Sequence, residues 1–177
     1  MSNNAATVGD DPFWSVVRRR HPDLDIVILP QEAPPIADSG LPERTAEPFA
    51  ELETAEAEDC WARLVGHGAP VQSVRWIPGP TGDSVCHSIT LTLDEAPAAV
   101  GIGHLREAEA LLTADGWQVF TPPTGMPRVL ANRPGELGSE KLLFGYAPET
   151  GRLFLRLTST GLPVGAGRAR ELIGSAS

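Results

Sequence analysis

The most regular alternation of hydrophobic and polar positions lies in the last third of the chain. In residues 141–146 every second side chain is large and apolar, and the same spacing recurs in residues 152–158. A period of two predicts β-strands with one buried face. Between the two segments, Pro148 fixes its own φ and Gly151 is free to adopt a positive φ, as a short hairpin loop requires. The stretch therefore predicts an antiparallel hairpin with one side covered.

Four more segments predict strands from their apolar spacing and β-branched content. The most regular is Val85–Leu93, in which His87 and the apolar side chains face one way, while Cys86 and the hydroxyl side chains face the other. Turns rich in proline and glycine separate these segments. The four predicted strands are Val71–Ile77, Val85–Leu93, Trp117–Thr121 and Val129–Asn132.

Three segments show the wider spacing of amphipathic helices. In Leu52–Val65 the acidic residues occupy the first half and Gly66 follows the last apolar residue, as is typical of a helix end. The second predicted helix is His104–Ala114, and a short third helix is predicted near Arg168–Ile173. The order of elements predicts an α+β domain, with helices packed on one face of a mostly antiparallel sheet.

The end of the second helix has its own signature. Asp115-Gly116-Trp117 follows the last apolar turn and predicts a Schellman motif. In that motif Gly116 takes a left-handed conformation and Trp117 folds back on Leu112. Trp117 is therefore expected in the core.

The composition changes along the chain and predicts four regions. Residues 1–11 are polar and predicted to be disordered, and residues 12–30 form a helix–strand element that Pro12 begins. Residues 31–50 are rich in proline and acidic residues, which predicts an extended, mobile linker. Residues 51–177 form the α+β domain, preceded by this helix–strand leader.

The hexamer Leu24–Leu29, LDIVIL, is the most strand-like segment of the chain. Burying such side chains is worth about 1.5–3 kcal/mol each, so the hexamer is too apolar to remain in water. We expect it to pair with an open edge of the sheet, with Phe13, Trp14 and Val17 packed beside it. The edge can belong to the same chain, to a second copy or to a partner, because the linker is long enough for each.

The charge of the chain is unevenly placed. The net charge is −9, and residues 1–59 hold thirteen acidic and four basic residues, whereas residues 60–177 hold ten of each. An acidic leader before a neutral body argues against binding to nucleic acid or to anionic membranes. There is no apolar run of the ~20 residues that a membrane span needs and no signal-peptide core. These patterns predict a cytoplasmic protein.

Asp83, Ser84 and His87 are close in sequence and invite comparison with a hydrolase. Ser84 lacks the G-x-S-x-G turn, and His87 lies on an apolar strand face. A nucleophile and its base also seldom come from one hairpin. We therefore interpret these residues as a turn followed by a histidine at the rim of the sheet.

Metal and cofactor sites are also not predicted. Cys60, His67, Cys86, His87 and His104 show no ligand spacing apart from the neighbours Cys86 and His87, which face opposite sides of a strand. The two cysteines are interpreted as buried free thiols.

A glycine pair could suggest a phosphate loop. Gly101-Ile102-Gly103 resembles half of such a loop, but it lacks the third glycine and the parallel strand before it. We interpret it as the start of a helix.

Arginines are the surface feature that best indicates binding. Arg152 and Arg156 share the solvent face of one predicted strand, with Phe154 between them. Two interpretations stay open: a solvated face that balances the acidic leader, or a docking surface for an acidic partner, where arginine and aromatic residues are the usual anchors. The arginines expected on this face are Arg75, Arg128, Arg133, Arg152 and Arg156.

Phe13, Trp14 and the run Arg18-Arg19-Arg20 form a second candidate surface. They are either part of an N-terminal element docked on its own chain or a short linear motif that a partner reads.

The layout of the chain resembles that of accessory proteins from actinobacterial type VII (ESX) secretion loci. The features that carry the resemblance are the leader DPFWSVVRRRHPD, continued by LDIVILP, the linker rich in proline and glutamate, and a small α+β body containing LLTADGWQVF. The resemblance covers the layout of the chain. The body has no Trp-Xaa-Gly turn of a WXG100 substrate and no P-loop of the motor ATPase. The resemblance implies a cytosolic chaperone or adaptor with no catalytic residues.

These patterns together predict a non-enzymatic protein-binding, adaptor or chaperone module in the cytoplasm, without cofactor or metal. Its partner is another protein or a second copy of the chain, and neither nucleic acid nor a membrane. The alternative is a small-ligand-binding or hydrolytic α+β domain with a pocket near His87. The predicted partner-binding residues are Phe13, Trp14, Arg18, Arg19, Arg152, Phe154 and Arg156.

Overall fold

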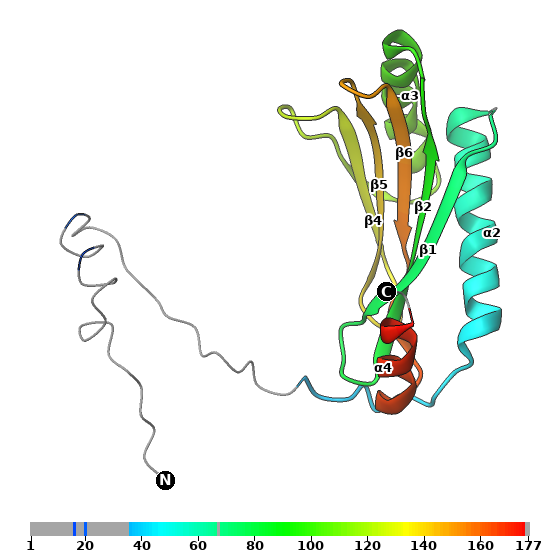
Figure 1. The fold of residues 1–177 in the computed structure, drawn as a ribbon, viewed down its shortest axis with the longest axis vertical. Coiled ribbons are helices and arrows are strands. Elements are labelled where there is room, and N and C mark those ends of the chain that lie inside the picture. The colour runs from blue at the N-terminus through cyan, green and yellow to red at the C-terminus, as the bar shows by residue number, and fades with distance from the viewer. Residues whose placement is uncertain (1–15, 17–19, 21–35, 67, 176–177) are drawn as a thin grey trace. The chain divides into compact units, whose positions relative to one another are not determined.

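The computed structural model describes residues 36–66 and 68–175, together with Val16 and Arg20. The chain divides into two units, Met1–Pro35 and Ile36–Ser177. In the first unit Val16 and Arg20 are helical and exposed, and the rest of the predicted leader lies outside the described residues. The second unit holds the sheet and the helices that cover it (Figure 1).

The described part of the second unit contains three helices and seven strands. None of its helices combines the length and the apolar composition needed to cross a bilayer. In chain order the elements are α2 (Ala46–Val65), β1 (Val71–Pro78), β2 (Ser84–Leu93), α3 (Ala98–Ala114), β3 (Gln118–Phe120), β4 (Arg128–Pro134), β5 (Ser139–Ala147), β6 (Arg152–Thr158), β7 (Leu162–Pro163) and α4 (Ala166–Gly174).

The strands form one open sheet in the order β1-β2-β6-β5-β4-β3, and the two-residue β7 pairs with the start of β2. Every pairing is antiparallel. β2 pairs with β1, its neighbour in sequence, on one side. On the other side it pairs with β6, which comes much later in the sequence. The predicted α+β class with a mostly antiparallel sheet is confirmed.

One face of the sheet is buried under α2 and α3, which lie on the same side of it (Figure 1). The register pairs the alternate apolar residues of β5 with those of β6, for example Phe144 with Leu155, and both are fully buried. Trp61 of α2 and Leu112 of α3 join the same core. A smaller apolar cluster, which includes Val85, holds α4 at one end of the sheet. The predicted buried faces of these strands are therefore confirmed.

The segment before α2 is not the mobile linker that the sequence predicts. In residues 36–45, the backbone N–H and the hydroxyl of Ser39 donate to the Asp83 carboxylate at 2.8 and 2.6 Å. The backbone N–H of Arg44 donates to the Pro163 carbonyl at 2.7 Å. These bonds hold the segment on the turn before β2 and on β7, because they satisfy groups that a free linker would leave to water.

Two helices begin earlier than predicted. α2 begins at Ala46, inside the predicted linker, and α3 begins at Ala98. Gly101 and Gly103 therefore lie within α3 and not at its start. A Cβ at position 101 would lie 2.5 Å from Cδ2 of Tyr146, so the glycine lets the helix approach the sheet closely.

The predicted Schellman motif at the end of α3 is confirmed. Gly116 has a φ of 84°, and the N–H of Trp117 donates to the Leu112 carbonyl at 3.0 Å. The N–H of Gly116 donates to the Thr113 carbonyl at 3.1 Å. Trp117 and Leu112 are both buried, so the motif directs the chain from α3 into the core before β3 begins.

Candidate functional site

The side of the sheet opposite α2 and α3, here called the open face, is covered by no helix of the described residues (Figure 1). Because directly paired residues of antiparallel strands share a face, the register identifies its side chains. Arg156 is paired with Leu143 on one side and with Thr90 on the other, and Phe154 is paired with Gly145 and Thr92. The basic residues on the open face are Arg75, Arg128, Lys141, Arg152 and Arg156.

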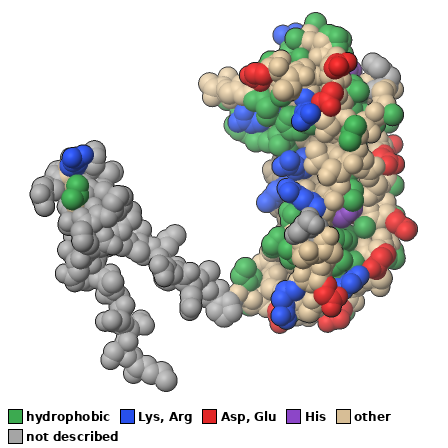
Figure 2. Space-filling view, in the orientation of Figure 1, with side chains coloured by type: hydrophobic (Ala, Val, Ile, Leu, Met, Phe, Trp, Pro, Cys, Tyr) green, Lys and Arg blue, Asp and Glu red, His purple; other side chains and the backbone are tan. Residues whose placement is uncertain are grey.

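The open face is positively charged although the protein has a net charge of −9. Glu140 is the only acidic residue in the described strands, and the register places it on the face that the helices cover. Arg152 forms an ion pair with Asp94, just beyond β2, at 2.7 Å. Among the residues that the structure describes, neither Arg75 nor Lys141 forms an ion pair. Figure 2 shows basic side chains gathered over the sheet and acidic ones frequent along α2.

A shallow hollow of about 510 Å³ lies in the open face over β3, β4, β5 and β6. Its floor contains the half-buried side chains of Leu130 and Leu143, and Phe120 projects at one side with 60% of its surface exposed. Lys141 and Arg156 line it from neighbouring strands. The hollow therefore combines an apolar floor with two cations that have no carboxylate partner in the described part of the chain.

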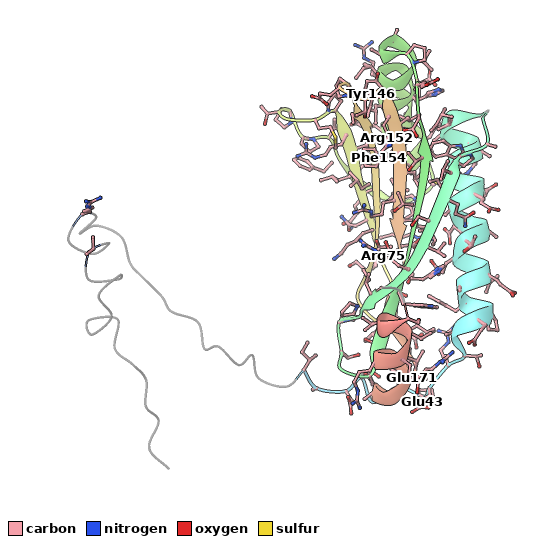
Figure 3. The ribbon with its side chains drawn as sticks, in the orientation of Figure 1. Glu43, Arg75, Tyr146, Arg152, Phe154 and Glu171 are labelled. Carbon is pink, nitrogen blue, oxygen red and sulfur yellow. The ribbon has the colours of Figure 1, made fainter. Side chains whose placement is uncertain are left out.

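Phe154 lies beside the hollow, in a position that depends on the absence of a side chain at Gly145. A Cβ at Gly145 would lie 2.5 Å from Cζ of Phe154, so the ring lies over the bare backbone of β5. Arg152 and Phe154 follow each other along the open face of β6 (Figure 3). The predicted arrangement of an aromatic residue between Arg152 and Arg156 is confirmed.

Arg133 does not belong to the open face, and its predicted place there is wrong. It is paired with Glu140 in the register and lies under α2, where it forms ion pairs with Glu140 and Glu56. Its guanidinium group lies 4.5 Å from the centre of the Trp117 ring. Arg133 thus joins β4 and β5 to α2 and stacks on a core aromatic residue.

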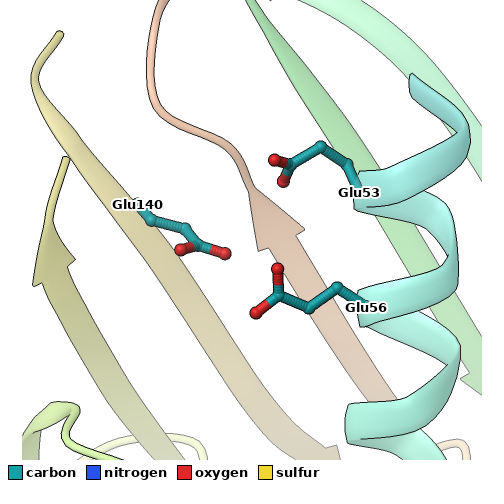
Figure 4. Close-up of side chains that lie close together, drawn as sticks. All are labelled: Glu53, Glu56 and Glu140. Carbon is teal, nitrogen blue, oxygen red and sulfur yellow. The ribbon is translucent and has the colours of Figure 1, made fainter. Parts of the chain in front are cut away.

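A cluster of three carboxylates lies between α2 and β5. One oxygen from each of Glu53, Glu56 and Glu140 lies within 4.8 Å of the others (Figure 4). Burial, followed by the charges of Glu140 and Glu56, raises the pKa of Glu53 to about 7. Burial also raises the pKa of Glu140, against the opposing effect of Arg133. Oε2 of Glu53 and Oε1 of Glu140 are buried and have no hydrogen-bond partner among the described residues.

This carboxylate cluster could contribute oxygen ligands to a divalent cation. However, the guanidinium group of Arg133 already forms ion pairs with two of the three carboxylates, and the pKa of about 7 means that Glu53 carries a proton in a large share of the molecules near neutral pH. The geometry therefore fits an ion-pair network that holds α2 on the sheet.

The structure does not bring Asp83, Ser84 and His87 together. The hydroxyl of Ser84 lies 2.7 Å from that of Thr81, and the Asp83 carboxylate accepts hydrogen bonds from Ser39, which lower its pKa. His87 is buried, so its predicted place at the rim is wrong, and burial lowers its pKa.

The ring of His87 packs against Trp76, with a distance of 4.7 Å between the ring centroids. His87 lines neither the hollow in the open face nor the two smaller hollows beside α3 and α2. The side chain is therefore part of the packing under β1 rather than the base of a hydrolytic site.

The thiols of Cys60 and Cys86 are free and buried, as predicted. Burial raises the pKa of Cys60 to about 11, so this thiol is not activated as a nucleophile. His67 lies outside the described residues, as do the predicted partner-binding residues of the leader, Phe13, Trp14, Arg18 and Arg19.

Comparison with protein families, with characterised proteins and with solved structures gives no match. Function must therefore be inferred from the geometry of this chain.

Proposed function

We propose that the protein is a non-enzymatic binding module, an adaptor or chaperone, whose open face holds an acidic and apolar segment of another protein. The observation that supports this is the separation of charge: five basic side chains and no acidic one occupy the strands of the open face, in a protein with a net charge of −9. A merely solvated face would more often mix both signs.

The apolar floor strengthens the case for a protein partner. Leu130, Leu143 and Phe154 are only half-buried, and a partner's apolar side chains would remove them from water. Each such side chain contributes about 1.5–3 kcal/mol when it is fully buried. Arginine next to an aromatic residue is also the usual composition of an energetic centre in a protein interface.

The alternative of a ligand-binding or hydrolytic site near His87 stays a prediction that no feature of the site favours. A role in the cytoplasm, and the role in type VII secretion that the resemblance implies, also stay predictions. A chaperone for a secreted partner would use the same open face to shield that partner's apolar segment.

The test is selection from a library of displayed random peptides on the full chain. We expect the enriched peptides to be acidic and apolar, and to lose binding to the double variant Lys141→Glu, Arg156→Glu. The matched control is Arg170→Glu, which reverses an exposed charge on α4, away from the open face. Enriched peptides that bind the double variant and the native protein equally would refute the proposal.

A further inference from the structure

We infer that the segment bound on the open face is an amphipathic, acidic α-helix of a partner protein, lying over β3–β6. This inference rests on the proposed function and specifies the conformation and the charge of the bound segment. It follows from three features of the open face: its half-buried apolar floor, the pairing of β4, β5 and β6 on both sides, and the spacing of two cations.

The sheet has apolar side chains on both faces, but the described helices cover only one. On the covered face, α2 and α3 pack on the alternate residues of β5 and β6. On the open face, Leu130 of β4 and Leu143 of β5 share the hollow with Phe120 of β3. A sheet that is apolar on both sides is normally covered on both, most often by helices.

The backbone of the hollow favours a helix over an extended segment. β4 pairs with β3 and β5, β5 with β4 and β6, and β6 with β5 and β2, so these strands have neighbours on both sides. Most of their N–H and C=O groups are therefore used within the sheet, whereas β3, which has a partner strand on one side, keeps a free outer edge. An extended segment lying on this face would find few backbone partners, whereas a helix satisfies its own.

The width of the hollow agrees with this. Four neighbouring strands at a spacing of about 4.8 Å extend over about 14 Å between the outer strand axes. A helix with its side chains is about 10–12 Å across. One helix therefore covers the floor between Phe120 and Arg156.

The cations set the charge pattern of the helix. Lys141 is paired with Thr158, and Leu143 with Arg156, so Lys141 and Arg156 are diagonal neighbours on β5 and β6. Such neighbours lie about 7–8 Å apart at their Cα atoms, close to the spacing of helix residues i and i+4 at about 5–6 Å. Glutamates at i and i+4 beside a leucine stripe would therefore meet both cations at once.

The experiment uses the full chain and a fluorescent synthetic peptide of about 18 residues. The peptide has leucines at i, i+4, i+7 and i+11 and a glutamate after each leucine, on an alanine and glutamine background. One control peptide carries a central proline, which breaks the helix, and a second has its leucines spread evenly around the helix. The protein variants are the double variant Lys141→Glu, Arg156→Glu and its control Arg170→Glu.

We expect saturable binding that both control peptides and the double variant weaken by at least about tenfold, while Arg170→Glu leaves it unchanged. Circular dichroism verifies that each variant is folded, and Lys141→Gln with Arg156→Gln replaces the double variant if it is not. Light scattering of the free protein should show a monomer, which separates partner binding from self-association through the same face.

The other outcomes overturn the inference in distinguishable ways. If the proline peptide binds as well as the helical one and the double variant loses both, the open face takes extended segments and the proposed function stands. If the protein is a dimer that the double variant dissociates, a second copy occupies the face. If no acidic peptide binds in either conformation, both the inference and the proposed function fail.

Discussion

Glu53→Gln should make the protein more stable at alkaline pH while changing little at acidic pH. Glu53 has a pKa raised from 4.5 to about 7, chiefly by burial and then by Glu140 and Glu56. Between pH 4.5 and about pH 7 the folded state keeps the Glu53 proton that the unfolded state releases, so the free energy of unfolding falls as pH rises. The stability that the protonated Glu53 side chain contributes is fully present below pH 4.5 and is lost as the pH passes 7. Glutamine has no such proton to lose.

The size of the effect follows from the same pKa. Each pH unit over which only the folded state holds the proton is worth about 1.4 kcal/mol, which sets an upper limit of about 3 kcal/mol across this window. Glu53 is only partly buried, so solvent screens the interaction. We expect Glu53→Gln to exceed the native protein by about 1–2 kcal/mol at pH 8.

Urea unfolding of both proteins at several values between about pH 5 and pH 8 measures this difference. Glu58→Gln is the control, because Glu58 is an exposed residue of the same helix and should show no such trend. The reasoning about the carboxylate cluster is wrong if the difference between native and Glu53→Gln proteins stays constant over this range.

Three further predictions concern packing and the leader. Trp117→Ala should lower the free energy of unfolding by about 3–5 kcal/mol, because Trp117 is buried against Arg133; an unchanged urea midpoint would contradict its core position. Gly101→Ala should destabilise by about 1–3 kcal/mol through the clash with Tyr146, whereas Gly103→Ala, with no atom within 4 Å of the added Cβ, should stabilise by about 0.5–1 kcal/mol; equal effects in thermal unfolding would disprove the close contact. Deleting residues 1–30 and measuring stability and mass separates the fates predicted for the leader: lost stability in a monomer means docking in its own chain, a lost dimer means exchange, and no change means a free motif.

The sequence predicts the elements well where the alternation is uninterrupted. β6 has its predicted bounds, Arg152–Thr158, and Gly66 ends α2 with a φ of 76°. The sequence pattern misses the start of α2 because Pro48 belongs to a proline-rich segment that predicts a linker, although proline is tolerated in the first turn of a helix. In α3, Gly101 lowers the helix propensity, but its packing on Tyr146 overrides that preference.

The open face and the carboxylate cluster were only partly predictable from the sequence, although the sequence does indicate the buried position of Glu140. Glu140 stands two residues before Leu142, so the period of two already places a carboxylate on the buried face. The same rule places Arg133 beside Val129 and Ala131 rather than with the other arginines. The register that brings Leu143 and Lys141 next to Arg156 depends on non-local strand pairing, which no local pattern encodes.

The pairing of β2 with β6 has a consequence for how the protein is made. Leu93 pairs with Leu153 and Ser88 with Thr158, so this pairing, here called the seam, joins residues sixty to seventy positions apart in the sequence. At a synthesis rate of about 5–20 residues per second, β2 leaves the ribosome roughly 3–14 s before β6. During that interval one edge of β2 has no strand to pair with, and the closing of this long loop makes the seam a slow, late step of folding. The nascent chain is therefore most vulnerable to aggregation at the centre of its final sheet, while the outer hairpin of β1 and β2 can already form.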